Sequence, residues 1–208
     1  MNTVITIGRE FGSGGREIGK RLAELLGIAY YDKEIVAEIS NRTKLAENYV
    51  HQIVEQSPQM LFPITTARTL HHTISNDYMF RQYSSIYTEQ ANVLHEMAEK
   101  SSCVIVGRCA DYILRDLQPL RLFVYADMPT KLARCREKAE EHENLSDKKL
   151  IRKIKRVDRS RKKYYQYYTG HTWGRRGNYD LLINTSSLNV EHVAVLLAGL
   201  IFAREENL

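Results

Sequence analysis

The sequence is short of the residues that mark several protein classes. It has only 3 cysteines in 208 residues, and an odd count without a CxxC pair argues against a disulfide framework and a structural zinc site. With 4 prolines and 11 glycines, it is neither collagen-like nor a Pro/Gly-rich disordered chain. No apolar run reaches the ~20 residues that span a bilayer, and no signal peptide is visible. We therefore expect a cytoplasmic globular protein without a membrane partner.

Basic charge is concentrated in one segment. The net charge is +5, but the window Lys148–Lys163 holds 10 basic residues and one acid, Asp158, so it carries +9 and the remainder −4. This pattern indicates a localised anion site more than an extended nucleic-acid surface. Tyr164–Tyr168 and Trp173 could stack bases, but packing against the body is the preferred interpretation, and RNA binding ranks third among the functions considered.

Alternating strand and helix signals predict the fold class. Helical patterns separate five short, nearly continuous apolar runs, as expected for an α/β protein with an open parallel sheet. The predicted strands are Thr3–Ile7, Ile28–Tyr31, Cys103–Val106, Leu122–Tyr125 and Leu181–Ile183.

The intervening segments predict helices and one domain. Residues 33–102 form a helical insertion, with helices over Leu45–Gln56 and Ser84–Lys100 and breaks at Pro58 and Pro63. Later helices are predicted after Asp127, over Lys148–Lys163, and over Val190–Ala203 behind an Asn189 cap. Because no linker interrupts the chain, residues 1–208 are predicted to form one domain.

The most informative segment is a glycine-rich turn between the first strand and the following helix. It reads Gly12-Ser13-Gly14-Gly15-Arg16-Glu17. Glycines allow backbone N–H groups to converge on an anion, and the helix N-terminus adds partial positive charge. A turn that binds nothing is the alternative, but three glycines within four residues in this context favour a nucleotide phosphate site.

The turn departs from the usual G-x-x-x-x-G-K-[ST] pattern. Aligning its glycines places Gly15 at the lysine position, and Glu17, two residues further on, is the nearest side chain with an oxygen that could take the part of the hydroxyl. Arg9, Arg16 or a more distant arginine could supply the missing charge, and Glu17 could bind Mg²⁺ directly or through water. Alternatively, the loop holds nucleotide without catalysing transfer.

Motifs along nearly the whole chain resemble the cytidylate kinase-like family of P-loop nucleoside monophosphate kinases. They are the Gly12–Gly19 loop, Tyr30–Glu34, Val106–Arg108, Asp158–Arg161 and Tyr179–Leu188. The resemblance implies a five-stranded parallel sheet, ATP and Mg²⁺ as cofactors, acceptor binding by the 33–102 insertion and a lid at about residues 145–175. Cytidylate kinases carry the loop lysine, so the resemblance supports phosphate chemistry better than it supports CMP as the substrate.

The resemblance also suggests acceptor-site residues. It assigns Asp32 and Arg108 to the acceptor, Asp158 to the acceptor sugar, and Arg161 to the transferring phosphates. Cys109 stands where the family's Gly-Arg-Asp motif has aspartate, and Arg108 could instead pair with a carboxylate at the sheet edge.

Helical spacing places further arginines near the proposed reaction. Arg152, Arg156, Arg159 and Lys163 share one helical face, and Arg161 lies off it. A solvated, salt-bridged helix is the alternative to an anion site. In the kinase hypothesis, Arg156, Arg159 and Arg161 close over the γ-phosphoryl group, and Arg16 replaces the lysine.

The function expected is ATP-dependent phosphoryl transfer to a CMP- or dCMP-like nucleoside monophosphate or a similar small phosphorylated acceptor. The alternative is a nucleotide-binding sensor without turnover.

Overall fold

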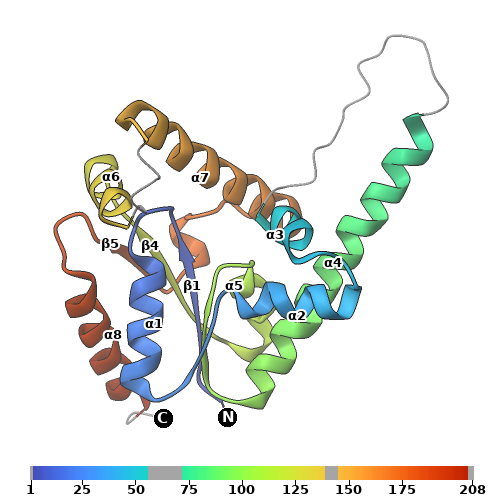
Figure 1. Cartoon of the computed structure of the whole chain (residues 1–208). Coiled ribbons are helices and arrows are strands. Elements are labelled where there is room, and N and C mark those ends of the chain that lie inside the picture. The colour runs from blue at the N-terminus through green and yellow to red at the C-terminus, as the bar shows by residue number, and fades with distance from the viewer. Residues whose placement is uncertain (1, 56–71, 139–144, 206–208) are drawn as a thin grey trace.

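The computed structural model describes residues 2–55, 72–138 and 145–205, and it forms one five-stranded parallel sheet with helices on both faces (Figure 1). The strand order is β2-β3-β1-β4-β5, which confirms the predicted fold class. The elements in chain order are β1 (Val4–Arg9), α1 (Gly15–Leu26), β2 (Ala29–Tyr31), α2 (Glu34–Thr43), α3 (Glu47–Glu55), α4 (His72–Lys100), β3 (Cys103–Val106), α5 (Ala110–Ile113), the 3-10 helix η1 (Arg115–Leu117), β4 (Leu120–Tyr125), α6 (Met128–Glu137), α7 (Asp147–Thr169), the 3-10 helix η2 (Arg176–Asn178), β5 (Leu181–Asn184) and α8 (Val190–Glu205).

Both faces of the central strands are buried. In β1, Ile5 and Ile7 pack toward α1 and α8, and in β3 the alternate residues Cys103 and Ile105 face the helices on the other side. Since successive strand side chains point to opposite faces, a strand covered on both sides is apolar throughout. This packing explains why the strands read as continuous apolar runs.

The central strand β1 is longer than predicted. It ends at Arg9 rather than Ile7, because Gly8 and Arg9 continue the parallel pairing opposite Phe123 and Val124 of β4. Arg9 is therefore the last strand residue before the glycine-rich turn. The observed β3 matches its prediction, and the boundaries of the other strands differ from the predicted ones by at most two residues.

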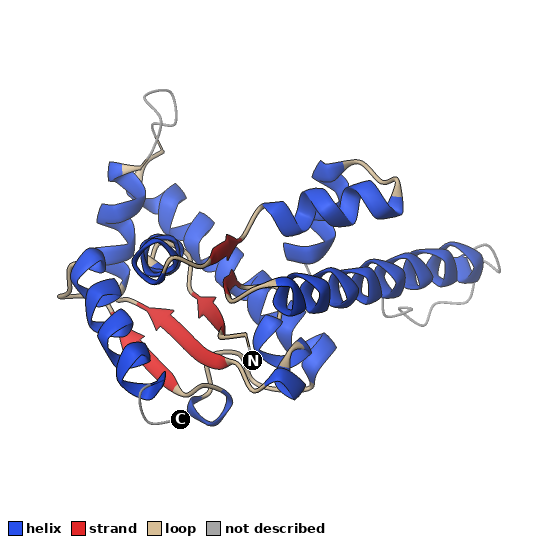
Figure 2. Ribbon diagram, turned by 90° about the horizontal axis from the view of Figure 1, so that it is seen from below, coloured by secondary structure: helices blue, strands red, loops and turns tan. Residues whose placement is uncertain are grey.

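Helices α2, α3 and α4 connect β2 to β3, and the described part of residues 33–102 contains no strand. Helix α4 is longer than the predicted Ser84–Lys100 because it begins at His72. Figures 1 and 2 show that it extends far beyond the sheet. Pro58 and Pro63 lie outside the described residues. None of the described helices has the length and hydropathy needed to cross a bilayer.

The later helices begin where the sequence predicts. The Asp127 side chain accepts a 2.9 Å hydrogen bond from the Thr130 N–H at the start of α6, and Asn189 accepts one of 2.8 Å from the Glu191 N–H at the start of α8. Helix α7 continues past the predicted Lys163 to Thr169, and it ends at Gly170, whose φ is 70°.

Candidate functional site

The glycine-rich turn wraps the N-terminus of α1. Gly12 and Gly14 have φ values of 76° and 84°, a conformation that favours glycine. Buried Ser13 fixes the turn between them: its hydroxyl donates to the Glu10 carbonyl at 2.9 Å, and its own carbonyl accepts hydrogen bonds from Arg134 at 2.9 Å and Thr185 at 2.7 Å. The backbone is thus held in place before any ligand binds.

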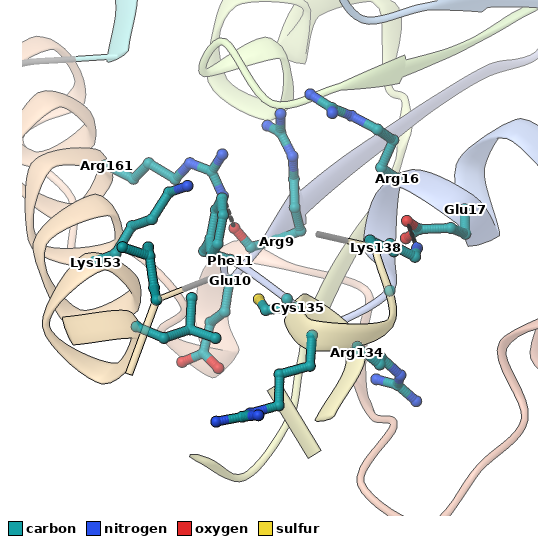
Figure 3. A pocket seen from close by; sticks show the side chains of 16 residues that line it. Arg9, Glu10, Phe11, Arg16, Glu17, Arg134, Cys135, Lys138, Lys153 and Arg161 are labelled. Atoms are coloured by element: carbon teal, nitrogen blue, oxygen red, sulfur yellow. Dashed lines mark hydrogen bonds and ion pairs between the residues drawn. The ribbon is translucent and has the colours of Figure 1, made fainter. Parts of the chain in front are cut away.

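A cavity of about 360 Å³ opens beside this turn (Figure 3). That volume lies within the ~300–1,000 Å³ typical of small-molecule sites. The turn, α6 and α7 all contribute side chains, and positive charge predominates. The charged residues of the lining are Arg9, Glu10, Arg16, Glu17, Arg134, Arg136, Lys138, Lys153 and Arg161.

Asp32 binds two of the arginines expected to replace the lysine. Its carboxylate accepts from Arg16 Nε at 2.6 Å and from Arg9 Nη2 at 3.3 Å. Asp32 is only 3 % exposed, whereas the Arg16 side chain is 52 % exposed. Burial and the nearby Asp32 carboxylate raise the pKa of Tyr30 to about 12. The structure therefore places Asp32 beneath the turn, beside Arg9 and Arg16.

Asp158 ties α7 to the turn. One of its carboxylate oxygens accepts from the Phe11 N–H at 2.7 Å, and the other accepts from Lys131 Nζ at 3.0 Å. Lys131 is 5 % exposed and also contacts Glu10 at 2.5 Å. These contacts connect the turn after β1 with α6 and α7 beside the cavity. The acceptor-sugar role expected for Asp158 remains a prediction.

Helix α7 turns a different face to the cavity from the one that the basic stripe suggested. Lys153 and Arg161 line the cavity, whereas Arg156 and Arg159 are exposed to solvent. Arg161 donates to the Arg9 carbonyl at 3.3 Å, and its guanidinium lies 5.9 Å from the centre of the Phe11 ring. The structure thus brings Arg161 to the site and leaves Arg156 and Arg159 outside it.

A second, smaller cavity of about 40 Å³ adjoins the first. Arg108 lines it at the end of β3, where Gly107, Arg108 and Cys109 have positive φ values of 81°, 60° and 53°. Such backbone strain clusters at functional sites. Among the described residues, Arg9 and Arg161 line both cavities. These two guanidinium groups therefore lie where a group passing between the cavities would meet positive charge.

The second cavity also contains Asp111, a buried carboxyl group. Burial raises the pKa of Asp111 from 3.8 to about 6, although the 2.6 Å hydrogen bond from Tyr165 and nearby Arg121 and His171 act in the opposite direction. The folded state therefore binds this proton more tightly than the unfolded state does.

Asp111 makes folding stability depend on pH. Its stabilising contribution is complete below about pH 4 and disappears as the pH rises through about 6, a loss on the order of 3 kcal/mol. We expect Asp111→Asn to remove this decrease, measured by denaturant unfolding at pH 4.5 and 7.5. An unchanged difference between the two pH values would contradict this assignment.

Sequence reasoning identified part of this constellation. It anticipated the Gly12–Glu17 turn and singled out Arg108 and Arg161, which line the two cavities. It missed Lys131, Arg134 and Lys153, which no local motif distinguishes from other basic residues. Glu17 lines the cavity, where its carboxylate forms an ion pair with Lys138.

The sheet order and the glycine-rich turn between β1 and α1 are those of a P-loop kinase fold. A family model described as the cytidylate kinase-like family matches residues 4–187, and the chain belongs to this family. A comparison with curated protein sequences gives no match.

Solved structures show the same fold. An uncharacterized protein from Eubacterium ventriosum is 28% identical, with a TM-score of 0.69 and coverage of 96% of this chain and 98% of its own. Shikimate kinase from Bacteroides thetaiotaomicron is 17% identical, with a TM-score of 0.56 and coverage of 97% and 99% respectively. For shikimate kinase from Acinetobacter baumannii in complex with shikimate, the identity is 17%, the TM-score 0.53 and the coverage 98% and 94%. At such low identity, the two shikimate kinases support the fold alone.

Proposed function

We propose that the protein transfers the γ-phosphoryl group of ATP to a nucleoside monophosphate, CMP- or dCMP-like, or to a similar small phosphorylated acceptor. The observation that carries this proposal is the pair of adjoining cavities with Arg9 and Arg161 between them. In this arrangement, the larger cavity receives the ATP phosphates and the smaller one receives the acceptor phosphate. Arg161 then neutralises charge on the group in transit.

The chain needs no general base for this reaction, because an acceptor phosphate is already nucleophilic. Its contribution is positioning and charge neutralisation. Backbone N–H groups of residues 12–16 hold the donor phosphates, and Lys153 approaches them from α7. Arg156 and Arg159 reach the transferring group only after α7 moves, because both are exposed in this structure.

The size of the second cavity limits which acceptor enters it. A volume of about 40 Å³ is far below the ~300 Å³ of a small nucleotide site. A nucleoside monophosphate therefore requires α3 and α7, which contribute Val54 and Tyr164 to the lining, to separate. We assign acceptor recognition to Arg108, which lines the second cavity, and to Asp32, which lines neither cavity and reaches the site through its ion pairs with Arg9 and Arg16. The lid role is assigned to about residues 145–175.

Magnesium fits the larger cavity through Glu17. Mg²⁺ is commonly held by one or two carboxylates together with substrate phosphates and water. Glu17 lies on the first turn of α1 and lines the cavity, so Mg²⁺ binding there would exchange its Lys138 partner for the metal. The metal would neutralise phosphate charge, while Glu17 would orient it.

Nucleotide binding and phosphoryl transfer, measured separately, test the proposal. We expect ATP with Mg²⁺ at ~100 times its Kd to stabilise the fold by about 2.7 kcal/mol in a thermal-shift experiment. A panel of nucleoside monophosphates should then yield ADP and a diphosphate product. Stabilisation by ATP without transfer to any acceptor would identify a nucleotide sensor, which the missing loop lysine also favours. No stabilisation by any nucleoside triphosphate would overturn both functions.

A further inference from the structure

The phosphate-binding pattern G-x-x-x-x-G-K has a glycine six residues before its lysine. With Gly15 at the lysine position, that first glycine corresponds to Arg9. The chain thus has glycine where the pattern has a cation, and a cation where the pattern has glycine. We infer that Arg9 supplies, from the end of β1, the positive charge that the lysine supplies from α1. This inference rests on the proposed nucleotide site.

Packing links the two positions. A Cβ atom at Gly15 would lie 2.6 Å from Arg9 Cβ and 3.3 Å from Arg9 Cγ. Real Cβ atoms essentially never approach another heavy atom as closely as the first distance. Gly15 is buried and is not among the residues with positive φ, so its backbone conformation does not require glycine. Space requires it instead: the stem of Arg9 occupies the place into which a side chain at position 15 would project.

The guanidinium of Arg9 is placed for this role. Arg9 is 7 % exposed, and its head group lies against Gly107 at the end of β3, next to the second cavity. Figure 3 shows the side chains of Arg9 and Arg16 extending in the same general direction. Both guanidinium groups bind the Asp32 carboxylate. Together, two guanidinium groups and one carboxylate carry one net positive charge, as the absent lysine would.

The structure favours Arg9 over Arg16, the replacement that the sequence suggested. Arg16 lines only the larger cavity among the two described, and its side chain is 52 % exposed at the rim. Arg9 lines both cavities and is buried. A buried guanidinium between donor and acceptor acts in a lower effective dielectric, where its interaction with phosphate is stronger.

A reciprocal exchange tests the inference. Arg9→Gly should weaken ATP binding by about tenfold, because a charged hydrogen-bonding partner is lost. Gly15→Lys should lower the Tm, because the new side chain meets the Arg9 stem. The double variant Arg9→Gly/Gly15→Lys restores the glycine and the lysine of the usual pattern. Relative to the single variants, we expect it to recover ATP affinity and part of the Tm, since Val124 Cβ still lies 3.2 Å from a Cβ atom at position 15. Arg21→Ala, which removes an exposed arginine paired with Glu24 on α1, is the matched control.

The outcomes separate this inference from the proposed function. Recovery in the double variant supports the exchange even if no acceptor is found, because ATP affinity and Tm do not require turnover. If the wild type binds ATP but the double variant binds it no better than the weaker single variant, the inference is overturned and the nucleotide site stands. An Arg9→Gly variant with wild-type ATP affinity, alongside a large loss in Arg16→Ala, would assign the role to Arg16. A wild type that binds no ATP would remove the proposed function and this inference with it.

Discussion

Arg161→Ala is expected to lower kcat by about 10³-fold while changing the ATP dissociation constant only modestly. Arg161 lines both cavities and lies beside the Arg9 carbonyl, between the proposed donor and acceptor phosphates. An arginine in such a position acts mainly on charge that develops as the phosphoryl group moves. Its removal therefore affects the transition state more than the bound nucleotide. Single-turnover kinetics and ATP titration measure the two effects separately.

Neighbouring basic residues on α7 provide the controls for this experiment. Lys162→Ala removes the same charge from an exposed position and should leave kcat within about twofold of wild type. Arg156→Ala removes an arginine from the exposed face of α7 that carries the basic stripe, and its effect is compared with that of Arg161→Ala on the face that lines the cavity. A loss confined to Arg161→Ala would show that the face of α7 observed at the cavity acts in transfer. Equal losses in Arg156→Ala and Arg161→Ala would instead show that α7 moves during turnover and brings Arg156 to the transferring group, and they would contradict a role for Arg161 that exceeds that of Arg156.

The sequence was sufficient to predict the sheet and the position of the glycine-rich turn because both depend on local signals. Buried parallel strands leave continuous apolar runs, and a glycine cluster between a strand and a helix is typical of a phosphate-binding turn. The end of β1 was harder to predict, since Gly8 is not typical of a strand. Its pairing with β4 extends the strand as far as Arg9.

The orientation of α7 shows why charge periodicity was insufficient. Arg152, Arg156, Arg159 and Lys163 do share a face, but that face is exposed. Buried Leu150, Ile154, Tyr164 and Tyr165 determine which side packs against the body. A helix is oriented chiefly by its apolar side chains, because their burial contributes more than exposed charges do. Arg161 lies on the same inward side of α7 as these apolar residues, and for this reason it reaches the cavity.

Contacts between distant segments could not be predicted from spacing. Arg134 holds the Ser13 carbonyl across 121 positions, and Lys131 reaches Asp158 across 27. Neither pair forms a local motif, and both require α6 to be placed beside the glycine-rich turn. The relation between Arg9 and Gly15 is a different case. The sequence shows a cation at the glycine position of the pattern and a glycine at its lysine position, but only the packing shows that the Arg9 side chain fills the space beside Gly15.

Lys131→Met is expected to cost about 3 kcal/mol of folding stability at pH 7. The variant keeps much of the apolar stem but leaves Glu10 and Asp158 facing each other without the ammonium group that contacts both. The Lys131 side chain is 6 % exposed, and the Glu10 and Asp158 side chains are 26 % and 17 % exposed, so the carboxylates left behind remain partly desolvated. Removing one partner from such an ion pair costs more than the pair contributes. Lys149→Met, at an exposed position on α7, should change stability by less than ~0.5 kcal/mol.

A second substitution shows whether uncompensated charge causes that loss. Asp158→Asn removes one of the two carboxylates, yet its amide oxygen can still accept the hydrogen bond from the Phe11 N–H. Lys131→Met/Asp158→Asn should therefore be more stable than Lys131→Met alone, and denaturant unfolding of the four proteins gives the coupling energy. Additive losses would show that Lys131 stabilises the fold by packing. Recovery in the double variant would show that its charge holds α6 and α7 together beside the glycine-rich turn.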